Sequence, residues 1–342
     1  MKTDISVCIP VYNTERYLAQ CLESIAAQDF TGSVEVLVLS DASPGRDERG
    51  WSAEKIVKDF KKRFSNKFGM TKPACKLELS FRYLENSQNL ALVENRRRLV
   101  NEAHGEYIFM LDSDDFLPQG ALTSLYEAAR KNDADVVQGD IITYDLEGKN
   151  HIESKNEAQA YPAVLEGKAV FAECFCNHKY RAFVTAKLIR RAVYERALED
   201  IPYIKVLMAE DMLQYFFIAL YAKKYIGINV PVYNYRIGYG ITVKQISDIE
   251  DWRKVCSTAS VITALYAWVE EKTLATGKNP LDQNEMKMLQ NLAKAYCIDN
   301  VKQLRANVVS ELYESAHQML CDYWGEEAIK NTESFLNNSD CE

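Results

Sequence analysis

The stretch Tyr107-Ile-Phe-Met-Leu-Asp-Ser-Asp-Asp115 constrains the fold more than any other part of the chain. Five apolar or aromatic residues run directly into three carboxylates, those of Asp112, Asp114 and Asp115. A short continuous apolar run predicts a strand buried on both faces, as in a parallel sheet. The carboxylates then lie at the carboxyl end of this strand, where open α/β sheets bind their ligands.

Asp112 and Asp114 are suited to bind a divalent cation. They are separated only by the small Ser113. Carboxylates, completed by phosphate oxygens of a substrate, are ligands that suit Mg²⁺ or Mn²⁺. The alternative is an acidic turn that caps the helix expected after Pro118. We predict a metal site with Asp112 and Asp114 as its protein ligands.

Strands and helices alternate through the first 111 residues. Strands are predicted at 6–12, 34–39, 76–84 and 106–111, with helices at about 14–25, 51–68 and 91–103. Three strand–helix units followed by a strand predict an α/β fold with a doubly wound, mostly parallel, Rossmann-like sheet.

The pattern changes after Pro118 and again after Ile246. A helix to about Asn132 and a strand at 135–138 are followed by a polar region, 140–180, without a clear period. Residues 186–191 lead into another helix, 209–220 form a helix, and 225–235 form a last strand broken by Pro231. Beyond Ile246, helices are predicted at 250–273, 282–304, 306–322 and 326–336. We therefore expect a domain of residues 1–245 and an α-helical C-terminal region of residues 246–342.

Composition narrows the class of protein. No run of 18 apolar residues predicts a membrane span, and the chain enters its first strand directly, so no signal peptide is expected. The nine cysteines are an odd number without CxxC spacing, which favours free thiols in a reducing cytosol. Residues 246–342 hold 9 Lys+Arg against 16 Asp+Glu, which accounts for −7 of the net charge of −8. The acidic C-terminal region argues against a polybasic tail that binds nucleic acid. The free thiols and the absence of a predicted signal peptide lead us to expect a cytoplasmic protein.

One basic segment could still meet a membrane. Residues 55–72 hold seven Lys+Arg and one Asp beside an apolar helix face. Such a helix could lie at the inner face of a membrane. The alternative is a solvated helix whose apolar face packs on the sheet.

In this order, the blocks of the chain resemble the family 2 glycosyltransferases, which have the GT-A fold. The matching blocks are residues 6–13, 39–43, 89–96, 105–115 and 210–211, and the resemblance covers about residues 4–245. It implies a nucleotide-sugar half at about 1–117 and an acceptor half at about 118–245. Two blocks depart from the family's pattern. Ser40-Asp-Ala-Ser43 replaces Asp-Asp-Gly-Ser, and the third block has Ala91 for Gly and Asn95-Arg-Arg97 for Ala-Arg-Asn.

The resemblance implies a site for a nucleoside diphosphate sugar. Asp114 would contact Mn²⁺ or Mg²⁺ directly, and Asp112 would face the ribose or the water shell of the metal. Asp115 would cap the following helix or support the metal ligands. The remaining donor-site residues implied are Pro10, Tyr12, Asn13, Glu15, Asp41, Arg96 and Ser113.

Two of these residues, Tyr12 and Asp41, also have a structural alternative. Tyr12 lines the base pocket or packs in the core. Asp41 accepts the ring N–H of uracil, which favours a UDP-sugar, or makes an Asx turn with Ser43. Arg96 reaches the diphosphate with its forked guanidinium, whereas its neighbours Arg97 and Arg98 are expected to be solvated or paired.

The family's Glu-Asp pair corresponds to Glu210 and Asp211. Asp211 would then be the base that deprotonates the acceptor hydroxyl, which inverts the anomeric configuration. The alternative is that both acids only stabilise a helix N-terminus. Arg236 would touch phosphate or acceptor.

The predicted function is sugar transfer to a hydroxyl of a glycan or a lipid-linked acceptor, in bacterial surface polysaccharide synthesis. Three other functions are compatible with parts of the sequence. A nucleotidyltransferase usually has a Gly-rich loop and a Lys after its first strand. A Rossmann oxidoreductase needs a GxGxxG motif after a strand, and no predicted strand of this chain is followed by one. A non-catalytic sugar-nucleotide scaffold would use the C-terminal helices to recruit partners. The same helices could also form a homodimer.

Overall fold

The computed structural model describes residues 3–68, 77–153, 158–237 and 245–339. Contacts along the chain define two compact units. The first comprises Met1–Tyr203 and Gln214–Tyr239, and the second comprises Ile204–Leu213 and Gly240–Glu342. The second unit thus contains a short segment from the middle of the chain, which a division at residue 245 did not foresee.

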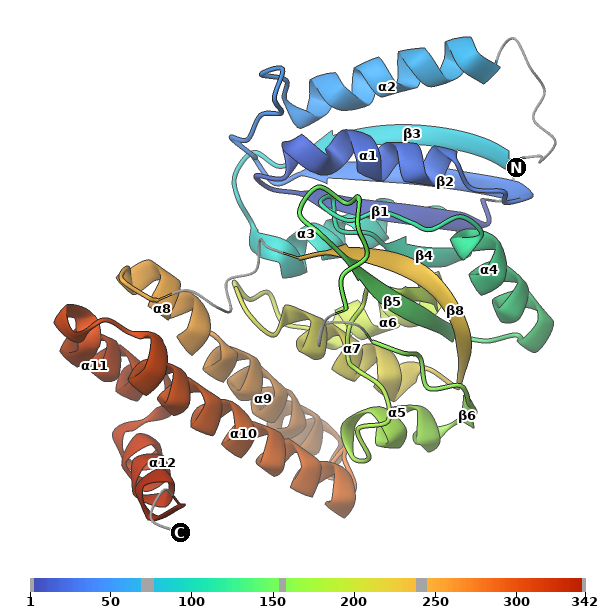
Figure 1. Ribbon diagram of the computed structural model, residues 1–342. Coiled ribbons are helices and arrows are strands. Elements are labelled where there is room, and N and C mark those ends of the chain that lie inside the picture. Colours follow the sequence, from blue (N-terminus) through green and yellow to red (C-terminus); the bar gives the residue numbers. More distant parts are fainter. Residues whose placement is uncertain (1–2, 69–76, 154–157, 238–244, 340–342) are drawn as a thin grey trace. The chain divides into compact units, whose positions relative to one another are not determined.

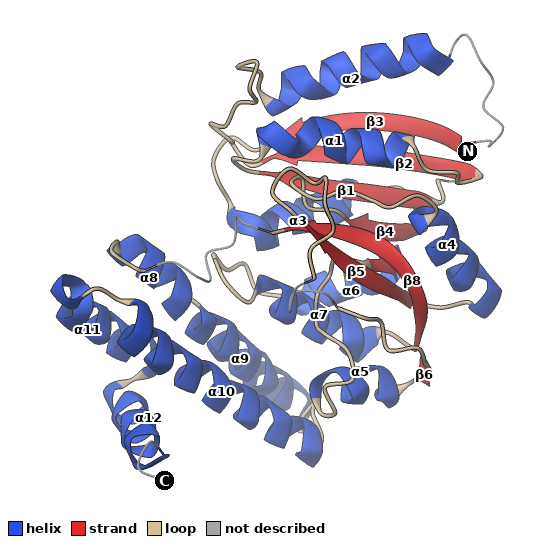
Figure 2. Cartoon of the chain, in the orientation of Figure 1, coloured by secondary structure: helices blue, strands red, loops and turns tan. Residues whose placement is uncertain are grey.

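The first unit is built on a single eight-stranded sheet (Figure 1). Its strand order is β3-β2-β1-β4-β7-β5-β8-β6. The strands are β1 (Ile5–Val11), β2 (Gly32–Ser40), β3 (Leu77–Glu85), β4 (Tyr107–Met110), β5 (Val136–Tyr144), β6 (Val164–Glu166), β7 (Lys187–Arg190) and β8 (Lys224–Arg236). Helices flank the sheet, as Figure 2 shows. They are α1 (Glu15–Ala26), α2 (Ala53–Phe68), α3 (Ala91–Glu102), α4 (Ala121–Asn132), α5 (Lys168–Phe175), α6 (Arg191–Asp200) and α7 (Glu210–Tyr221), whose first residues belong to the second unit.

The direction of the strands confirms the predicted doubly wound, mostly parallel sheet. β1 pairs in parallel with β2 and β4, β2 with β3, and β5 with β8. Only β7, between β4 and β5, and β6, at the edge beside β8, run antiparallel to their neighbours. Every residue of β1 and β4 is buried, as expected for strands covered on both faces. The carboxyl ends of β1, β2 and β4 therefore meet at one edge of the sheet.

The main core lies beneath α1, α2 and α4. Alternate residues of β1 face this core because side chains along a strand point to opposite faces. The apolar side of α2 is part of it: Ile56, Val57 and Phe60 are all buried. The apolar face of the basic segment is therefore occupied by the sheet and is not presented to a membrane, as the structural alternative predicted.

Several elements differ from the sequence-based expectation. Residues 186–191 contain the strand β7, which the pattern did not predict. The region 140–180 contains β6 and α5, and β5 extends to Tyr144 rather than ending at 138. The helix expected at 250–273 is two helices, α8 (Ile249–Cys256) and α9 (Thr258–Thr276), separated at Ser257. The start of the third strand at residue 76 lies outside the described residues.

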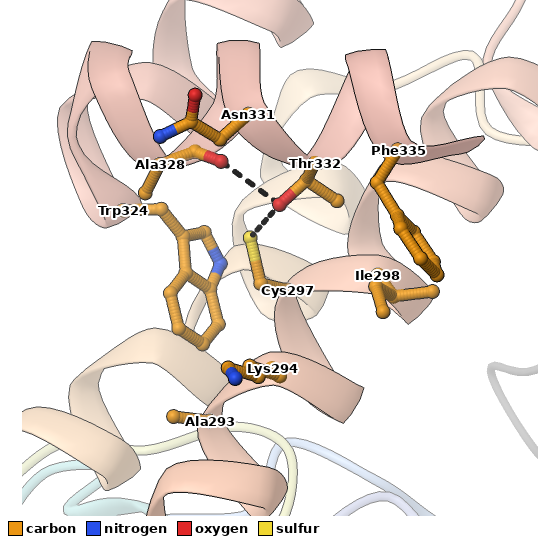
Figure 3. Close-up of a pocket in the computed structure, with 9 residues that line it drawn as sticks. All are labelled: Ala293, Lys294, Cys297, Ile298, Trp324, Ala328, Asn331, Thr332 and Phe335. Atoms are coloured by element: carbon orange, nitrogen blue, oxygen red, sulfur yellow. Dashed lines mark hydrogen bonds between the residues drawn. The ribbon is translucent and has the colours of Figure 1, made fainter. Parts of the chain in front are cut away.

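The second unit is helical, as predicted. After α8 and α9 come α10 (Gln283–Asn307), α11 (Tyr313–Trp324) and α12 (Glu326–Ser339). Trp252 is fully buried at its centre, and the indole Nε1–H donates to the carbonyl of Ala316 at 2.8 Å. A mainly apolar groove of about 510 Å³ lies between α10 and α12, with Trp324 and Phe335 among its lining residues (Figure 3).

Two expectations from composition can be compared with the described residues. The seven cysteines among them are all free thiols, as expected. No helix in this part of the chain is long and apolar enough to cross a membrane.

Candidate functional site

The acidic turn after β4 is fixed by the end of β8. The amide N–H of Asp112 donates to the hydroxyl oxygen of Tyr233 at 3.1 Å, and that hydroxyl donates to Asp115 Oδ2 at 2.7 Å. The other carboxylate oxygen of Asp115 accepts from the backbone N–H of Arg236 at 2.7 Å. Asp115 is buried and supports the turn from within. It does not cap the next helix, because α4 begins at Ala121 with Gly120 as its N-cap.

Asp112 and Asp114 are the carboxylates left to face a ligand. The Asp112 side chain is 32% exposed, and Asp114 is half-buried. Burial, reinforced by the negative charge of Asp112, raises the pKa of Asp114 from 3.8 to about 6, against the opposing effect of Arg236. Two carboxylates that repel one another in a partly buried site provide the hard oxygen donors that a divalent cation needs.

Two carboxylates alone can supply only part of a coordination shell. No group of three or more His, Cys, Asp or Glu side chains able to hold a metal occurs among the described residues. A Mg²⁺ or Mn²⁺ ion commonly takes one or two carboxylates and completes its shell with water and substrate phosphates. The pair Asp112 and Asp114 fits that mode of binding.

Arg96 lies beside this pair, and its predicted contact with a diphosphate stays a prediction. It projects from α3 and is buried, with Nη2 at 3.4 Å from Asp112 Oδ1. Arg97 is not solvated: it is buried, pairs with Glu94, and donates to carbonyl oxygens at the end of α6 and just beyond it. Arg98 is paired too, donating to the carbonyl of Glu85 and the side chain of Asn86.

The end of β1 brings three predicted donor-site residues, Pro10, Tyr12 and Asn13, to the same edge. Pro10 is buried within the strand, whereas Tyr12 is 47% exposed and so is not a core residue. Asn13 has a left-handed backbone, with φ of 58°, and its N–H donates to Ser43 Oγ at 2.8 Å. The hydroxyls of Thr14 and Ser113 are hydrogen-bonded at 2.6 Å, which joins the first turn of α1 to the acidic turn.

Glu15 has an unusual environment for a carboxylate. Its side chain is buried, and neither carboxylate oxygen has a hydrogen-bond donor among the described residues. Gly45 packs directly against it, since a Cβ at that position would overlap the carboxylate. Buried carboxylates are normally hydrogen-bonded. The described residues therefore leave the hydrogen-bonding capacity of this carboxylate unused.

Asp41 makes contacts that the sequence did not predict. Its Oδ1 accepts from Asn86 Nδ2 at 2.7 Å and from the N–H of Leu90 at 2.9 Å, and its Oδ2 accepts from the N–H of Ala91 at 3.1 Å. It therefore stabilises the N-terminus of α3, and the Asx turn with Ser43 is wrong. Recognition of uracil by Asp41 stays a prediction.

Ala42 and Ala91, which stand where the family pattern has glycine, both have a left-handed backbone. Their φ angles are 51° and 67°, in the left-handed region that costs an L-residue about 1–2 kcal/mol. The departures from the family pattern therefore change side chains at this edge and leave the backbone conformation that glycine would favour.

Glu210 and Asp211 open α7, as predicted, and Asp211 is half-buried. Both belong to the segment Ile204–Leu213 of the second unit. Within that unit, burial and the charge of Glu210 raise the pKa of Tyr296 to about 12. The role of Asp211 as a base stays a prediction.

The match to a family model decides the relationship of the chain to known proteins. The model for glycosyl transferase family 2 matches residues 6–197, which is more than half of the chain and spans the acidic turn. The chain belongs to this family.

Several relatives of this family 2 chain are named as glycosyltransferases. Glycosyltransferase GlyA of Streptococcus pneumoniae is 25% identical over 69% of this chain and 31% of its own length. The poly(ribitol-phosphate) β-N-acetylglucosaminyltransferase TarP of Staphylococcus aureus is 25% identical over 85% of this chain and 77% of its own. Against the first relatives, GlyA and GlyG, the chain spans well under half of their length, 31% and 40%.

A solved structure supports the fold assignment. The crystal structure of S. aureus TarS 1-349 in complex with UDP-GlcNAc matches with a TM-score of 0.52 and 19% identity, covering 98% of this chain and 92% of that one. The GT-A fold expected for a family 2 member is thereby confirmed.

Sequence reasoning missed the role of the β8 end in this family 2 chain. Tyr233 was not singled out, and Arg236 was expected to touch phosphate or acceptor. All three of its guanidinium nitrogens instead donate to protein oxygens, on Asp114, Leu146 and Gln20. The only signal in the sequence was an Arg at the end of a strand.

Proposed function

We propose that the protein is a metal-dependent glycosyltransferase that moves a sugar from a nucleoside diphosphate to an acceptor hydroxyl, with inversion. The observation that carries this proposal is the pair Asp112 and Asp114 at the carboxyl end of β4, beside the buried Arg96. When bound there, a divalent cation would offset the negative charge that develops on the leaving diphosphate.

The proposed donor is a UDP-sugar. Pro10, Tyr12, Asn13 and Asp41 lie at the ends of β1 and β2, at the edge where the acidic turn lies. Oδ2 of Asp41 accepts one protein hydrogen bond, which leaves it capacity for the ring N–H of uracil. Glu15 would accept from donor hydroxyls, and Ser113 and Arg96 would complete the diphosphate side. TarS, which shares the fold, was crystallised with UDP-GlcNAc.

In the proposed reaction, an acceptor oxygen attacks the anomeric carbon as the bond from that carbon to the diphosphate oxygen breaks. Asp211 takes the proton of the attacking hydroxyl, and the nucleoside diphosphate leaves with the bonding electrons. Because attack occurs opposite the leaving group, the anomeric configuration inverts. Arg96 would hold the diphosphate in line through charge-assisted hydrogen bonds.

The proposed acceptor is a hydroxyl of a surface polysaccharide or of its lipid-linked precursor. This choice follows the names of the relatives, which include glycosyltransferases of poly(ribitol-phosphate). A cytoplasmic location, at the inner face of the membrane where such precursors are assembled, is part of the same proposal. A homodimer through the C-terminal helices also remains a prediction, which gel filtration of the full chain would test.

A thermal-shift panel tests the donor. UDP, GDP and CDP are each added with and without Mn²⁺, because a ligand that binds only the folded state must raise the melting temperature. We expect a shift with UDP that requires Mn²⁺ and disappears in Asp114→Asn. A metal-dependent shift with GDP or CDP would instead contradict the assignment of Asp41 and keep the transferase.

Turnover tests the base and separates an enzyme from a scaffold. Release of UDP from UDP-GlcNAc is measured with a glycan acceptor. Asp211→Asn should lower turnover by about 10²–10⁴-fold while the UDP shift persists. Binding of UDP without any turnover across a panel of UDP-sugars and acceptors would favour the scaffold.

A further inference from the structure

The acidic turn is held by more contacts than its own backbone provides. Phe116, directly after the turn, exchanges two backbone hydrogen bonds with Asn234 of β8, at 2.9 and 3.3 Å. Tyr233 links the amide of Asp112 to the carboxylate of Asp115 through one hydroxyl. Tyr233 and Asn234 at the end of β8 therefore contact the turn at both of its ends.

Arg236 adds the contact at Asp114 itself. Its Nε–H donates to the backbone carbonyl of Asp114 at 2.6 Å. Nη1 donates to the carbonyl of Leu146 at 2.7 Å, and Nη2 donates to Gln20 Oε1 at 2.8 Å. The side chain is buried, and the guanidinium carbon lies 4.4 Å from the ring centroid of Tyr17. One guanidinium thus joins the acidic turn, the loop after β5 and helix α1.

The loop that Arg236 contacts through the carbonyl of Leu146 has hydrogen bonds of its own. The N–H of Gly148 donates to the carbonyl of Asp145 at 2.8 Å, and the N–H of Lys149 donates to Asp145 Oδ1 at 2.8 Å. Glu147 at its tip pairs with Arg16 of α1 at 3.0 Å. Gly148 has a φ of 65° and packs against the guanidinium of Arg236, where a Cβ would lie 2.7 Å from Nη1. The loop that holds Arg236 is therefore hydrogen-bonded internally and linked to α1.

We propose that Arg236, assisted by Tyr233, is a positioning residue that sets the geometry of Asp112 and Asp114 for the cation. The two carboxylates repel one another, so a loosely held turn would relax by moving them apart. Fixing the Asp114 carbonyl and the Asp112 amide keeps both carboxylates in place before the cation arrives. This role rests on the proposed function, because it concerns the metal site of that reaction.

The role explains why an arginine is needed at this position. Three acceptors, on the turn, the loop and α1, lie around one planar fork, and each takes a different nitrogen. A lysine keeps the positive charge, but its single ammonium cannot reproduce the fixed fork. If only the charge near Asp114 mattered, lysine would restore the site; if the fork matters, lysine would not.

The experiment measures Mn²⁺ affinity without nucleotide, by electron paramagnetic resonance of free Mn²⁺, on the full chain. Arg236→Gln and Arg236→Lys are each expected to weaken Mn²⁺ binding by about 10–100-fold, the range for residues that orient metal ligands. Tyr233→Phe is expected to weaken it in the same direction and serves if the Arg236 variants do not fold. Circular dichroism verifies the fold of each variant.

Arg190→Gln is the matched control. Arg190 also lies at the end of a strand and makes several hydrogen bonds, to Asp133, Ala134 and Asp135, but β7 places it beside Tyr107 at the opposite end of β4. Its loss should change Mn²⁺ affinity by less than about twofold, since distant sites without shared partners act independently.

The outcomes separate the positioning role from the function. Folded variants at Arg236 or Tyr233 that bind Mn²⁺ like the wild type would overturn the positioning role and leave the transferase untouched. Restoration of wild-type affinity by Arg236→Lys would overturn it too, because charge alone would then suffice. A wild-type protein that binds no Mn²⁺ would overturn the metal site of the proposed function, and the positioning role with it.

Discussion

Replacing Asp114 by Asn should stabilise the metal-free protein at neutral pH. Burial and the charge of Asp112 raise the pKa of Asp114 from 3.8 to about 6 in the folded state. A carboxyl with a raised folded-state pKa contributes stability that is present below its unfolded pKa and is lost as the pH rises through the folded one. Relative to a pH below 3.8, the free energy of unfolding has fallen by about 3 kcal/mol at pH 7.5, and by about half of that at pH 5.

Asn has nearly the shape of the protonated carboxyl and carries no charge. Without metal, urea unfolding at pH 7.5 should therefore show Asp114→Asn to be more stable than the wild type by up to about 3 kcal/mol. The difference should shrink as the pH is lowered to 5.

Asp4→Asn is the control of opposite sign. Burial raises the pKa of Asp4, but hydrogen bonds from Ser33 and Tyr126 outweigh it, so that the pKa is lowered overall. Stability from Asp4 is present above its unfolded pKa and is lost as the pH falls through the folded value. Asp4→Asn should therefore destabilise the protein at pH 7.5.

Adding Mn²⁺ should close the gap at Asp114. At a Mn²⁺ concentration of about 100 times the dissociation constant, binding to the folded state stabilises the wild type by about 2.7 kcal/mol. The variant lacks the Asp114 carboxylate that binds the ion and so lacks this stabilisation. An Asp114→Asn protein that is less stable than the wild type at pH 7.5 without metal would refute the electrostatic reasoning. A gap that Mn²⁺ leaves unchanged would refute the assignment of Asp114 as a metal ligand.

Three further predictions follow from the same structure. Because a proton competes with the cation at Asp114, Mn²⁺ affinity measured by spin resonance should fall by up to about tenfold per pH unit below about 6; a flat profile would contradict this. Ala42→Gly and Ala91→Gly should be neutral or stabilising by about 1 kcal/mol in urea unfolding, because glycine adopts a positive φ without strain. As a control, Ala129→Gly inside α4 should cost about 1 kcal/mol. Trp252→Phe should destabilise the helical unit by about 1–3 kcal/mol, because the carbonyl of Ala316 loses its donor in a buried site; unchanged thermal unfolding by circular dichroism would contradict it.

Much of the fold was predictable because its signals are local. The apolar runs of β1, β2 and β4 and the 3.6-residue period of α1 and α2 appear within single segments of sequence. β7 did not appear because its four residues become a strand only through pairing with β4 and β5, which come from distant parts of the chain. The break at Ser257 was missed for a related reason: both flanking helices continue the same apolar pattern.

The site divides in the same way. Asp112 and Asp114 could be identified because acid at the end of a buried strand is a local pattern. The contacts of Asp41 with Asn86, Leu90 and Ala91 could not, since they depend on how β2 meets α3. The contacts of Arg236 are still harder to predict from the sequence, because two of its three acceptors are backbone carbonyls, which every residue possesses.

The position of β7 has a consequence for synthesis on the ribosome. β4 lies in the middle of the sheet, yet one of its edges is covered only by β7. Until the ribosome has added the residues from Met110 to Lys187, the peptide groups of β4 that pair with β7 have no partner strand. At roughly 5–20 residues per second this interval lasts on the order of 4–15 seconds. An exposed apolar edge invites pairing with other chains. Slow translation between β4 and β7, or release of the chain before β7, should thus lower the yield of native protein more than a delay in the C-terminal helices.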